Sequence, residues 1–391
     1  MHTLTATYRI VTPMFLGDAD QKATGIRPPS VKGALRFWWR ALNWGRFRED
    51  ADDASALRKL HAAEAELFGA AAEENKHSGQ ARFILRTEYA PDTHKQEFAW
   101  SQSSGIQYLL GQGLWHFRDR LLRSFLAPGT LKLEMCLKEI SDEQCLQLQQ
   151  ALLALGLFGG LGSRSRRGLG SLAIQDIRDS LSDCVWIPKS PADLKKIPEC
   201  FALKSIDTLP PFSAFSRHSR LDISQQGNNS FHLLNAVGEE FQLYRSWGKA
   251  DRQGIHKVGG REAEQKFPED HNWARQAVDG IKPPYLPKRS IFGFPHNYFF
   301  SSDNRKVDIA PGAEGRGRRA SPLFIHAHFF PDGTHAVLQL LLPALFLPEH
   351  DRVELKSRKS FQLNVPAVDW KVIHNYMNRF KQREEVIHAE G

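Results

Sequence analysis

The chain has 391 residues, of which 41% are hydrophobic and 10% aromatic. This composition is typical of a globular protein, and the length is sufficient for two domains with separate cores. No run of about 18 apolar residues occurs and the first residues lack the apolar core of a signal peptide, so we expect a cytoplasmic protein. A net charge of +8 suits an anionic partner such as nucleic acid.

The first predicted element is a strand over residues 3–12, in which apolar and polar residues alternate. The loop over residues 14–20 follows it and contains Asp18 and Asp20. No partner base or metal ligand stands near these acids in the sequence, and a loop carboxylate alone does not make a catalytic site. We therefore expect them to be ordinary loop or cap residues.

A basic helix is predicted next. It should begin at Ser30, because serine is a good N-cap and the two prolines before it are not expected inside a helix. Lys32, Arg36 and Arg40 then recur every four residues and form a cationic stripe. Like charges at this spacing destabilise a helix by about 0.2–0.5 kcal/mol per pair. A polyanion lying along the stripe would offset that cost.

Aromatic side chains are interleaved with the basic ones over residues 27–48. Arg27 adds a charge just ahead of the helix, and Trp39 could stack on a base. The alternative is a solvated basic face beside an aromatic core, and we place Trp38 in that core.

The elements that follow complete one folding unit. They are a helix over 51–68 ended by Gly69, a strand over 81–89, a helix near 114–126, a strand over 131–137, a helix from a capping box at 141–144 to about 158, and a strand over 172–177. Without the helix near 114–126, the order is strand–helix–strand–strand–helix–strand. This order is typical of a ferredoxin-like (RRM-like) βαββαβ domain. We therefore predict an α+β fold with a first domain over residues 1–180.

A glycine-rich segment over residues 159–170 joins the last helix of this unit to its last strand. Glycines let a backbone approach phosphates closely, and the hydroxyls of Ser163 and Ser165 can donate to phosphate oxygens. Arginines add charge and bidentate geometry, and the segment contains Arg164, Arg166 and Arg167. It is not a Walker loop, because it lacks the Gly-Lys-Ser/Thr ending. The alternative is a flexible basic turn.

The second half, residues 181–391, predicts a second, irregular ferredoxin-like domain. It contains predicted helices over 231–247 and 368–381, a long basic loop over 281–319, and a hairpin over 322–342 that turns at Pro331-Asp332-Gly333. Because the chain ends ten residues after the last helix, the fourth strand should be absent or come from elsewhere. The basic run over 316–319, with Arg318 and Arg319, predicts either RNA or partner contact or a disordered loop.

No metal site, cofactor site or catalytic residue is predicted. The four cysteines show no CxxC spacing and are expected to be small buried residues. His326 and His328 would point to the same face of a strand and could form half a metal site. Since no third ligand stands at a recognisable spacing, we expect a structural role for this pair.

Several short motifs match those of a known protein family. They are Pro-Met-Phe-Leu-Gly at 13–17, the basic helix at 30–40, Leu-Phe-Gly at 67–69 and the glycine-rich segment at 162–172, with weaker matches at 293–295 and 318–322. On these motifs the chain resembles the RAMP superfamily. It is most similar to the first-numbered subunit of the Cmr complex, the type III-B CRISPR effector.

The resemblance implies two RAMP domains and a non-catalytic subunit of an RNA-guided antiviral complex. Such a subunit would bind the 3′ part of the guide RNA (crRNA), the target RNA, or both, and would contact the RAMP subunits of the complex backbone. The expected RNA-binding residues are Arg27, Lys32, Arg36, Trp39, Arg40, Ser163, Arg164, Ser165, Arg166, Arg167, Arg318 and Arg319. The alternatives are a metal-independent RAMP endoribonuclease that processes CRISPR transcripts, which would need a positioned general base, and a generic RNA chaperone.

Overall fold

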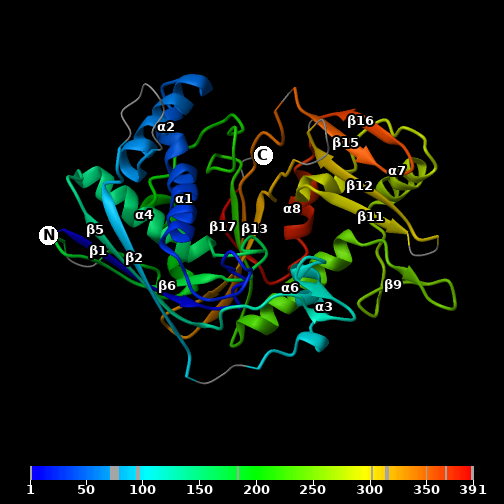
Figure 1. The fold of residues 1–391 in the computed structure, drawn as a ribbon, viewed down its shortest axis with the longest axis horizontal. Coiled ribbons are helices and arrows are strands. Elements are labelled where there is room, and N and C mark those ends of the chain that lie inside the picture. Colours follow the sequence, from blue (N-terminus) through cyan, green and yellow to red (C-terminus); the bar gives the residue numbers. More distant parts are fainter. Residues whose placement is uncertain are drawn as a thin grey trace.

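The computed structural model describes residues 2–70, 79–93, 97–182, 185–300, 303–312, 317–348, 350–365 and 368–388. Cys184 and Arg316, from the cysteine set and the basic run considered above, lie outside these residues. The fold is α+β, as predicted, and combines antiparallel sheets with helices that pack against them (Figure 1). In the described ranges, no helix is both long and apolar enough to cross a lipid bilayer.

The first sheet has the strand order β2-β5-β1-β6, and every neighbouring pair is antiparallel. Its strands are β1 (Thr3–Ile10), β2 (Phe83–Pro91), β5 (Gly129–Leu137) and β6 (Leu172–Asp179). The helices α1 (Pro28–Arg48) and α4 (Asp142–Phe158) belong to this unit, and α2 (Asp53–Phe68) packs against α1. The capping box at Ser141 and the end of α2 at Gly69 are confirmed.

The start of α1 differs from the prediction. The helix begins at Pro28 with Arg27 as its N-cap, so Ser30 lies inside the first turn. Proline is tolerated there, because the N–H groups of the first turn have no partner within the helix in any case. The two prolines therefore open the helix instead of preceding it.

No helix forms near residues 114–126, contrary to the prediction. The segment between β2 and β5 contains η1 (Trp100–Gln102), α3 (Ser104–Leu110) and a small hairpin of β3 (Trp115–His116) and β4 (Arg120–Leu121). The helix α3 packs across α6 of the second half, where Gly105 and Gly238 allow the two backbones to touch. The N-terminal half is thus anchored on the C-terminal half.

The second sheet has the order β13-β14-β7-β17, again antiparallel throughout. Its elements are β7 (Arg220–Gly227), α6 (Ser230–Arg245), β13 (Leu323–Phe329), β14 (His335–Leu341), α8 (Lys371–Met377) and β17 (Glu384–Ile387). The hairpin of β13 and β14 is confirmed. The expectation of a missing fourth strand is wrong, because β17 needs only four residues and pairs with β7.

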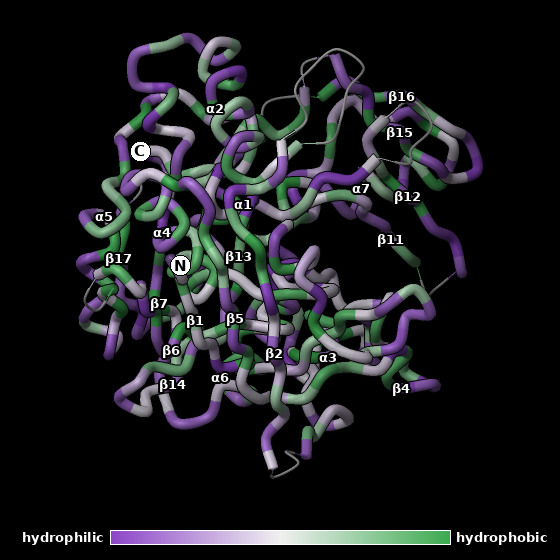
Figure 2. Tube along the Cα trace, turned by 60° about the vertical axis from the view of Figure 1, so that its left-hand side comes forward, coloured by the Kyte–Doolittle hydropathy of each residue, from purple (hydrophilic) through white to green (hydrophobic). Residues whose placement is uncertain are grey.

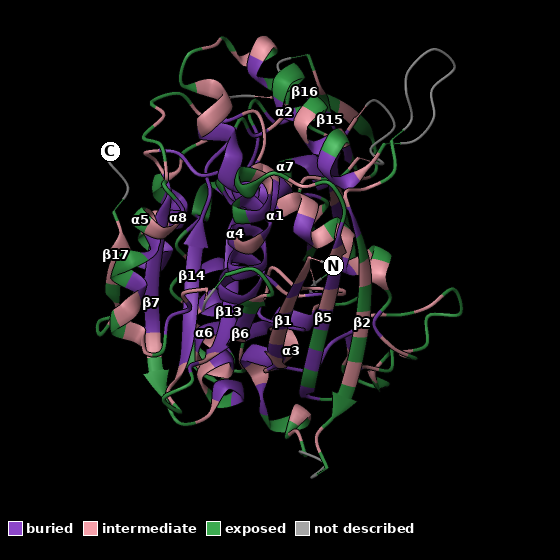
Figure 3. Ribbon diagram, turned by 90° about the vertical axis from the view of Figure 1, so that its left-hand side faces the viewer, coloured by how far each residue is buried: buried purple, intermediate pink, exposed green. Residues whose placement is uncertain are grey.

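The two sheets lie edge to edge. Figure 3 shows β13 beside β6, so that the strands of both sheets form one row. Side chains bridge the two edge strands: the Ala327 amide donates to Ser171 Oγ at 3.1 Å, and Gln175 Nε2 donates to the Phe329 carbonyl at 3.1 Å. One hydrophobic core includes residues from both sheets, from Leu4 of β1 to Leu340 of β14. Hydrophobic residues lie mainly along the central strands and helices, and the peripheral loops are mainly hydrophilic (Figure 2).

A third sheet lies within the second half and corrects the prediction of a long loop over 281–319. Its order is β11-β12-β15-β16, and α7 covers it with a separate small core. The elements here are β11 (His296–Phe300), β12 (Arg305–Pro311), β15 (Arg352–Lys356), β16 (Ser360–Asn364), α7 (Pro268–Val278) and η3 (Lys288–Phe292). The remaining short elements are η2 (Pro191–Lys196), α5 (Ile197–Cys200), β8 (Lys249–Ala250), β9 (His256–Val258) and β10 (Arg261–Glu262).

Candidate nucleic-acid interface

The cationic stripe of α1 is partly neutralised. Glu64 of α2 is buried beside it, and its Oε1 lies 3.2 Å from Arg36 Nε and 2.8 Å from Arg40 Nη1. Lys32 makes no such pair and lies over the Phe83 ring, at 5.6 Å from the centroid. Three positive charges and one negative charge leave +2. The three side chains of the stripe are therefore not all free to bind a polyanion. The helix predicted over 51–68 carries Glu64, which pairs with two of them.

Of the other two residues predicted on or beside this helix, Arg27 is accessible to a ligand and Trp39 is not. The Trp39 side chain is only 1% exposed, its Nε1 donates to Gln147 Oε1 at 3.0 Å, and its ring packs on Phe68. A base cannot reach this ring, so its predicted stacking role is wrong. Arg27 is exposed and makes only a long contact of 3.5 Å, from Nη2 to the Gly17 carbonyl.

The glycine-rich loop folds back on the end of α3. The backbone of Arg164 is left-handed, with φ at +66°, which turns its side chain toward that helix. Its Nε donates to the Leu110 carbonyl at 2.8 Å, and Arg167 Nη1 donates to the Leu109 carbonyl at 3.5 Å. The last carbonyls of a helix have no partner inside it. These two arginines therefore supply the missing donors and fix the loop in place.

Arg166 joins three segments of the chain. Its guanidinium lies 4.3 Å from the Phe324 ring centroid on β13 and 5.0 Å from that of Phe37 on α1. Its Nη1 donates to the Ser321 carbonyl at 2.5 Å. The basic helix and the glycine-rich loop therefore meet, through an aromatic ring of α1 and not through its cations.

The predicted basic residues of the second half lie beside this loop. Burial first, and then the charge of Arg318, lowers the pKa of Arg164. Burial and then Arg319 lower the pKa of Arg166 to about 10. Arg319 Nη2 donates to the Leu345 carbonyl at 3.3 Å. We call Arg164, Arg166, Arg167, Arg318 and Arg319 the junction arginines.

Among the residues that the structure describes, the junction arginines have no acidic partner. Throughout the described part of the chain, none of them forms an ion pair with a carboxylate, and their contacts are carbonyl oxygens, aromatic rings and one another. Several guanidinium groups are thus gathered in a partly buried place where no described residue supplies a counter-charge. Burying an unpaired charge is costly, so this arrangement favours an anionic ligand.

Arg245, near the end of α6, belongs to the same electrostatic group and was not predicted. It is 8% exposed, lies 4.6 Å from the Phe292 ring centroid, and its Nε has no hydrogen-bond partner among the described residues. Burial first, and then Arg245, lowers the pKa of Arg167 to about 9. In the sequence Arg245 is simply a basic residue in the last turn of a helix, which is common, so no signal distinguishes it.

Ser163 and Ser165 are half-buried on the same loop. The Ser163 amide donates to the Phe15 carbonyl at 2.8 Å, which ties the loop to the segment after β1. Neither hydroxyl forms a hydrogen bond with another described residue. Both hydroxyls can therefore still donate to a ligand.

Asp18 shapes its own loop. Its Oδ1 accepts hydrogen bonds from the amides of Asp20 and Lys22, each at 2.9 Å. The bond from Lys22 is the largest cause of the lowered pKa of Asp18. This is the geometry of a local turn, in which the carboxylate replaces a backbone acceptor.

His326 and His328 form a buried pair on β13. The two side chains are 1% and 0% exposed, and His326 Nε2 lies 3.2 Å from His328 Nδ1. Burial lowers the pKa of His326 to about 3 and that of His328 well below its usual value. Both rings are neutral at pH 7, and neither can reach a ligand at the surface.

Comparison with known proteins identifies the N-terminal part of the chain. Residues 7–173, which contain both α1 and the glycine-rich loop, match the RAMP superfamily. The chain is similar to two proteins of Pyrococcus furiosus, the CRISPR system Cmr subunits Cmr1-2 and Cmr1-1. The first is 28% identical over 186 residues, 44% of this chain and 94% of the relative. The second is 24% identical over 237 residues, 56% of this chain and 65% of the relative.

Two solved structures are similar in fold over nearly the whole chain. The crystal structure of Cmr1 from P. furiosus in its apo form has a TM-score of 0.57 at 16% identity, and the match covers 100% of this chain and 99% of that one. A chain in the cryo-EM structure of the type III-B Cmr-beta complex bound to cognate target RNA has a TM-score of 0.50 at 13% identity, covering 97% and 98%. The likeness therefore extends in fold beyond residues 7–173, into the second half.

Proposed function

We propose that this chain is a non-catalytic, RNA-binding subunit of a cytoplasmic type III-B CRISPR (Cmr) effector complex. It would hold the 3′ part of the crRNA, the target RNA, or both, and would contact neighbouring RAMP subunits. Two relatives are named as Cmr subunits, and one structural neighbour lies in a Cmr complex bound to target RNA. The observation that carries the proposal is the group of junction arginines, for which no described residue supplies a carboxylate partner.

The chemistry of this site suits a phosphate backbone. Guanidinium groups bind phosphate in a bidentate manner, and the free hydroxyls of Ser163 and Ser165 add donors. A phosphate placed here would offset the burial, and then the mutual repulsion, that lower the pKa of Arg164 and Arg166. Backbone recognition carries no base preference, as a protein that binds guides of many sequences requires. Lys32 lies on α1 and Arg27 is its N-cap, and both could extend the same path.

We also propose that the chain consists of two ferredoxin-like RAMP domains, over residues 1–180 and 181–391. In the first sheet the first strand of the unit, β1, lies between the third and fourth strands, β5 and β6. In the second sheet β7 lies in the same way between β14 and β17. A shared strand order with the same βαββαβ sequence of elements supports two copies of one plan, with the third sheet inserted in the second copy.

The proposal is tested by salt-dependent binding of labelled single-stranded RNA to the full chain. The variant combines Arg164→Ala with Arg318→Ala, and the matched control combines Arg36→Ala with Arg40→Ala, whose charges Glu64 already neutralises in part. Each phosphate contact contributes roughly 0.7 to the slope of log affinity against log salt for single strands. We expect the slope to fall by about 1.4 in the variant and to change little in the control.

The expected difference is large enough to measure. When salt is raised from about 50 to about 200 mM, both proteins bind RNA more weakly. With a slope change of about 1.4, the factor by which affinity falls is roughly sevenfold smaller for the variant than for the wild type. The change should be equal for two RNAs of unrelated sequence. An unchanged slope, or a loss confined to one sequence, would contradict the site. Arg318 is exposed, so Arg318→Ala alone, with about half the effect, serves if the double variant does not fold.

A further inference from the structure

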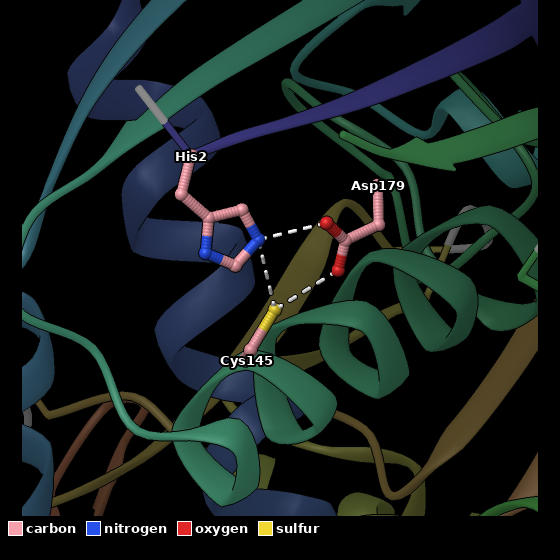
Figure 4. A group of neighbouring side chains, drawn as sticks. All are labelled: His2, Cys145 and Asp179. Carbon is pink, nitrogen blue, oxygen red and sulfur yellow. Dashed lines mark hydrogen bonds and ion pairs between the residues drawn. The ribbon is translucent and has the colours of Figure 1, made fainter. Parts of the chain in front are cut away.

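Three side chains that can bind a metal ion meet at the end of β6 opposite to the glycine-rich loop. They are His2, Cys145 and Asp179, and Figure 4 shows them pointing toward one another. His2 Nε2 lies 2.7 Å from Asp179 Oδ1 and 3.8 Å from Cys145 Sγ. Cys145 Sγ lies 3.3 Å from Asp179 Oδ2. In the described part of the chain, this is the one such group of three or more His, Cys, Asp or Glu ligands.

The fold explains why residues so far apart in sequence converge. β1 and β6 are antiparallel neighbours, and Leu4 pairs with Asp179, so the start of β1 lies beside the end of β6. Cys145 lies in the first turns of α4, which packs against β6. Three different elements therefore each contribute one donor to the same point. His2 and Asp179 are 177 residues apart, and so no spacing rule applied to the sequence could find the group.

The donor set and its spacing fit a zinc ion. Imidazole nitrogen, thiolate sulfur and carboxylate oxygen are all zinc ligands, with bond lengths of about 2.0–2.3 Å. A tetrahedral ion with such bonds separates its donor atoms by about 3.4–3.6 Å. Two of the three separations, at 3.3 and 3.8 Å, already lie near this range. The third, between His2 and Asp179, would have to lengthen by roughly 0.7 Å as their hydrogen bond is replaced by bonds to the ion.

Neighbouring groups hold the carboxylate in position. Gln149 Nε2 donates to Asp179 Oδ2 at 2.9 Å, and the Leu181 amide donates to Asp179 Oδ1 at 3.0 Å. Such outer contacts orient ligands in metal sites and affect metal affinity strongly. The side chain of Asp179 is 5% exposed, whereas that of His2 is 20% exposed. The group is therefore closed on the protein side and open on the side of His2.

We propose that His2, Cys145 and Asp179 bind one Zn²⁺ ion, with water as the fourth ligand on the open side. The ion would clamp the start of β1, the first turns of α4 and the end of β6. It is a structural site, separate from the junction arginines.

Cobalt and zinc binding by the full chain, with its own N-terminus and without a histidine tag, tests the site. Co²⁺ bound to a thiolate gives a sulfur-to-metal charge-transfer band, which reports the sulfur ligand directly. We expect one Co²⁺ per chain with this band, its displacement by Zn²⁺, and a higher thermal midpoint with Zn²⁺. Cys145→Ser should abolish the band. The matched control is Cys200→Ser, which removes a half-buried thiol elsewhere and should keep it.

His2→Gln provides a second variant if Cys145→Ser does not fold, because His2 lies at the start of the chain and is partly exposed. We expect it to weaken zinc binding at least about tenfold. Absence of the charge-transfer band in the wild type, or its loss in Cys200→Ser and not in Cys145→Ser, would overturn the proposal. In that case the group is only a hydrogen-bonded ion pair of His2 and Asp179 beside a thiol.

Discussion

The buried histidine pair of β13 should make the stability of this protein fall in mild acid. His326 and His328 are neutral in the folded chain, because burial lowers both pKa values. In the unfolded chain each has the usual pKa of about 6.5. Below that pH the unfolded state binds more protons than the folded state, so stability is lost as pH falls.

The size of this loss in the free energy of unfolding follows from the pKa shifts of the two histidines. Since the pKa of His326 in the folded chain is about 3, this residue stays neutral at about pH 5.5 in the folded state and is mostly charged in the unfolded state. Each such histidine then costs roughly 1 kcal/mol between about pH 7.5 and 5.5, and the pair costs roughly 2–3 kcal/mol. This is a substantial part of the 5–15 kcal/mol that is usual for the free energy of unfolding.

Urea unfolding followed by circular dichroism at both pH values measures the effect. The variant combines His326→Leu with His328→Leu, and His61→Gln, at an exposed position on α2, is the control. The wild type and the control should lose roughly 2–3 kcal/mol more than the double variant between the two pH values. Equal losses in all three proteins would refute the reasoning, because the buried pair would then not be the group that takes up protons on unfolding.

Two further predictions concern the helix contact and the loop acids. A Cβ added at Gly105 would lie 1.9 Å from the Asn235 carbonyl oxygen, so Gly105→Ala should cost at least about 1–3 kcal/mol in the free energy of unfolding. The control is Gly33→Ala, in which the new methyl group meets nothing within 4 Å, so this variant should be stabilised by about 0.5–1 kcal/mol. Equal thermal midpoints for the two variants would contradict the close packing of α3 on α6. Replacing Asp18 and Asp20 by Ala should leave target-RNA cleavage by an assembled effector complex unchanged in a gel assay, and loss of cleavage would show that these acids have a catalytic role.

The regular parts of this fold could be predicted because the local sequence determines them. Alternation of apolar residues gave β1 and β5, and the capping box gave the start of α4. The hairpin of β13 and β14 follows from its turn residues. These signals are strong because each element buries one periodic face or forms a turn of fixed geometry.

Other elements depend on distant contacts that the sequence does not reveal. β17 has only four residues and is a strand because β7 offers it a free edge. The strands β11 and β12 form part of a small sheet where a high content of glycine, proline and basic residues suggested a loop. The helix α3 is short, and its place is fixed by the contact of Gly105 with α6.

In the candidate site, too, some residues could be predicted from the local sequence and others depend on distant contacts. The glycine-rich segment and Arg318 and Arg319 could be selected by charge and glycine content, and the structure brings them together. The partner of the α1 stripe, Glu64, could not be assigned from the sequence, because its buried position depends on how α2 packs on α1. Arg245 could not be found either, since only the fold leaves its Nε without a hydrogen-bond partner among the described residues.

Cross-linking of the full chain to a photoreactive single-stranded RNA, followed by identification of the linked peptides, tests the central claim most directly. The account predicts cross-links in the loop around residues 162–168 and in residues 317–321, with few in α2 or in the face of α1 that contacts it. Cross-links confined to other surfaces, with none in these two segments, would contradict the claim that the junction arginines hold RNA.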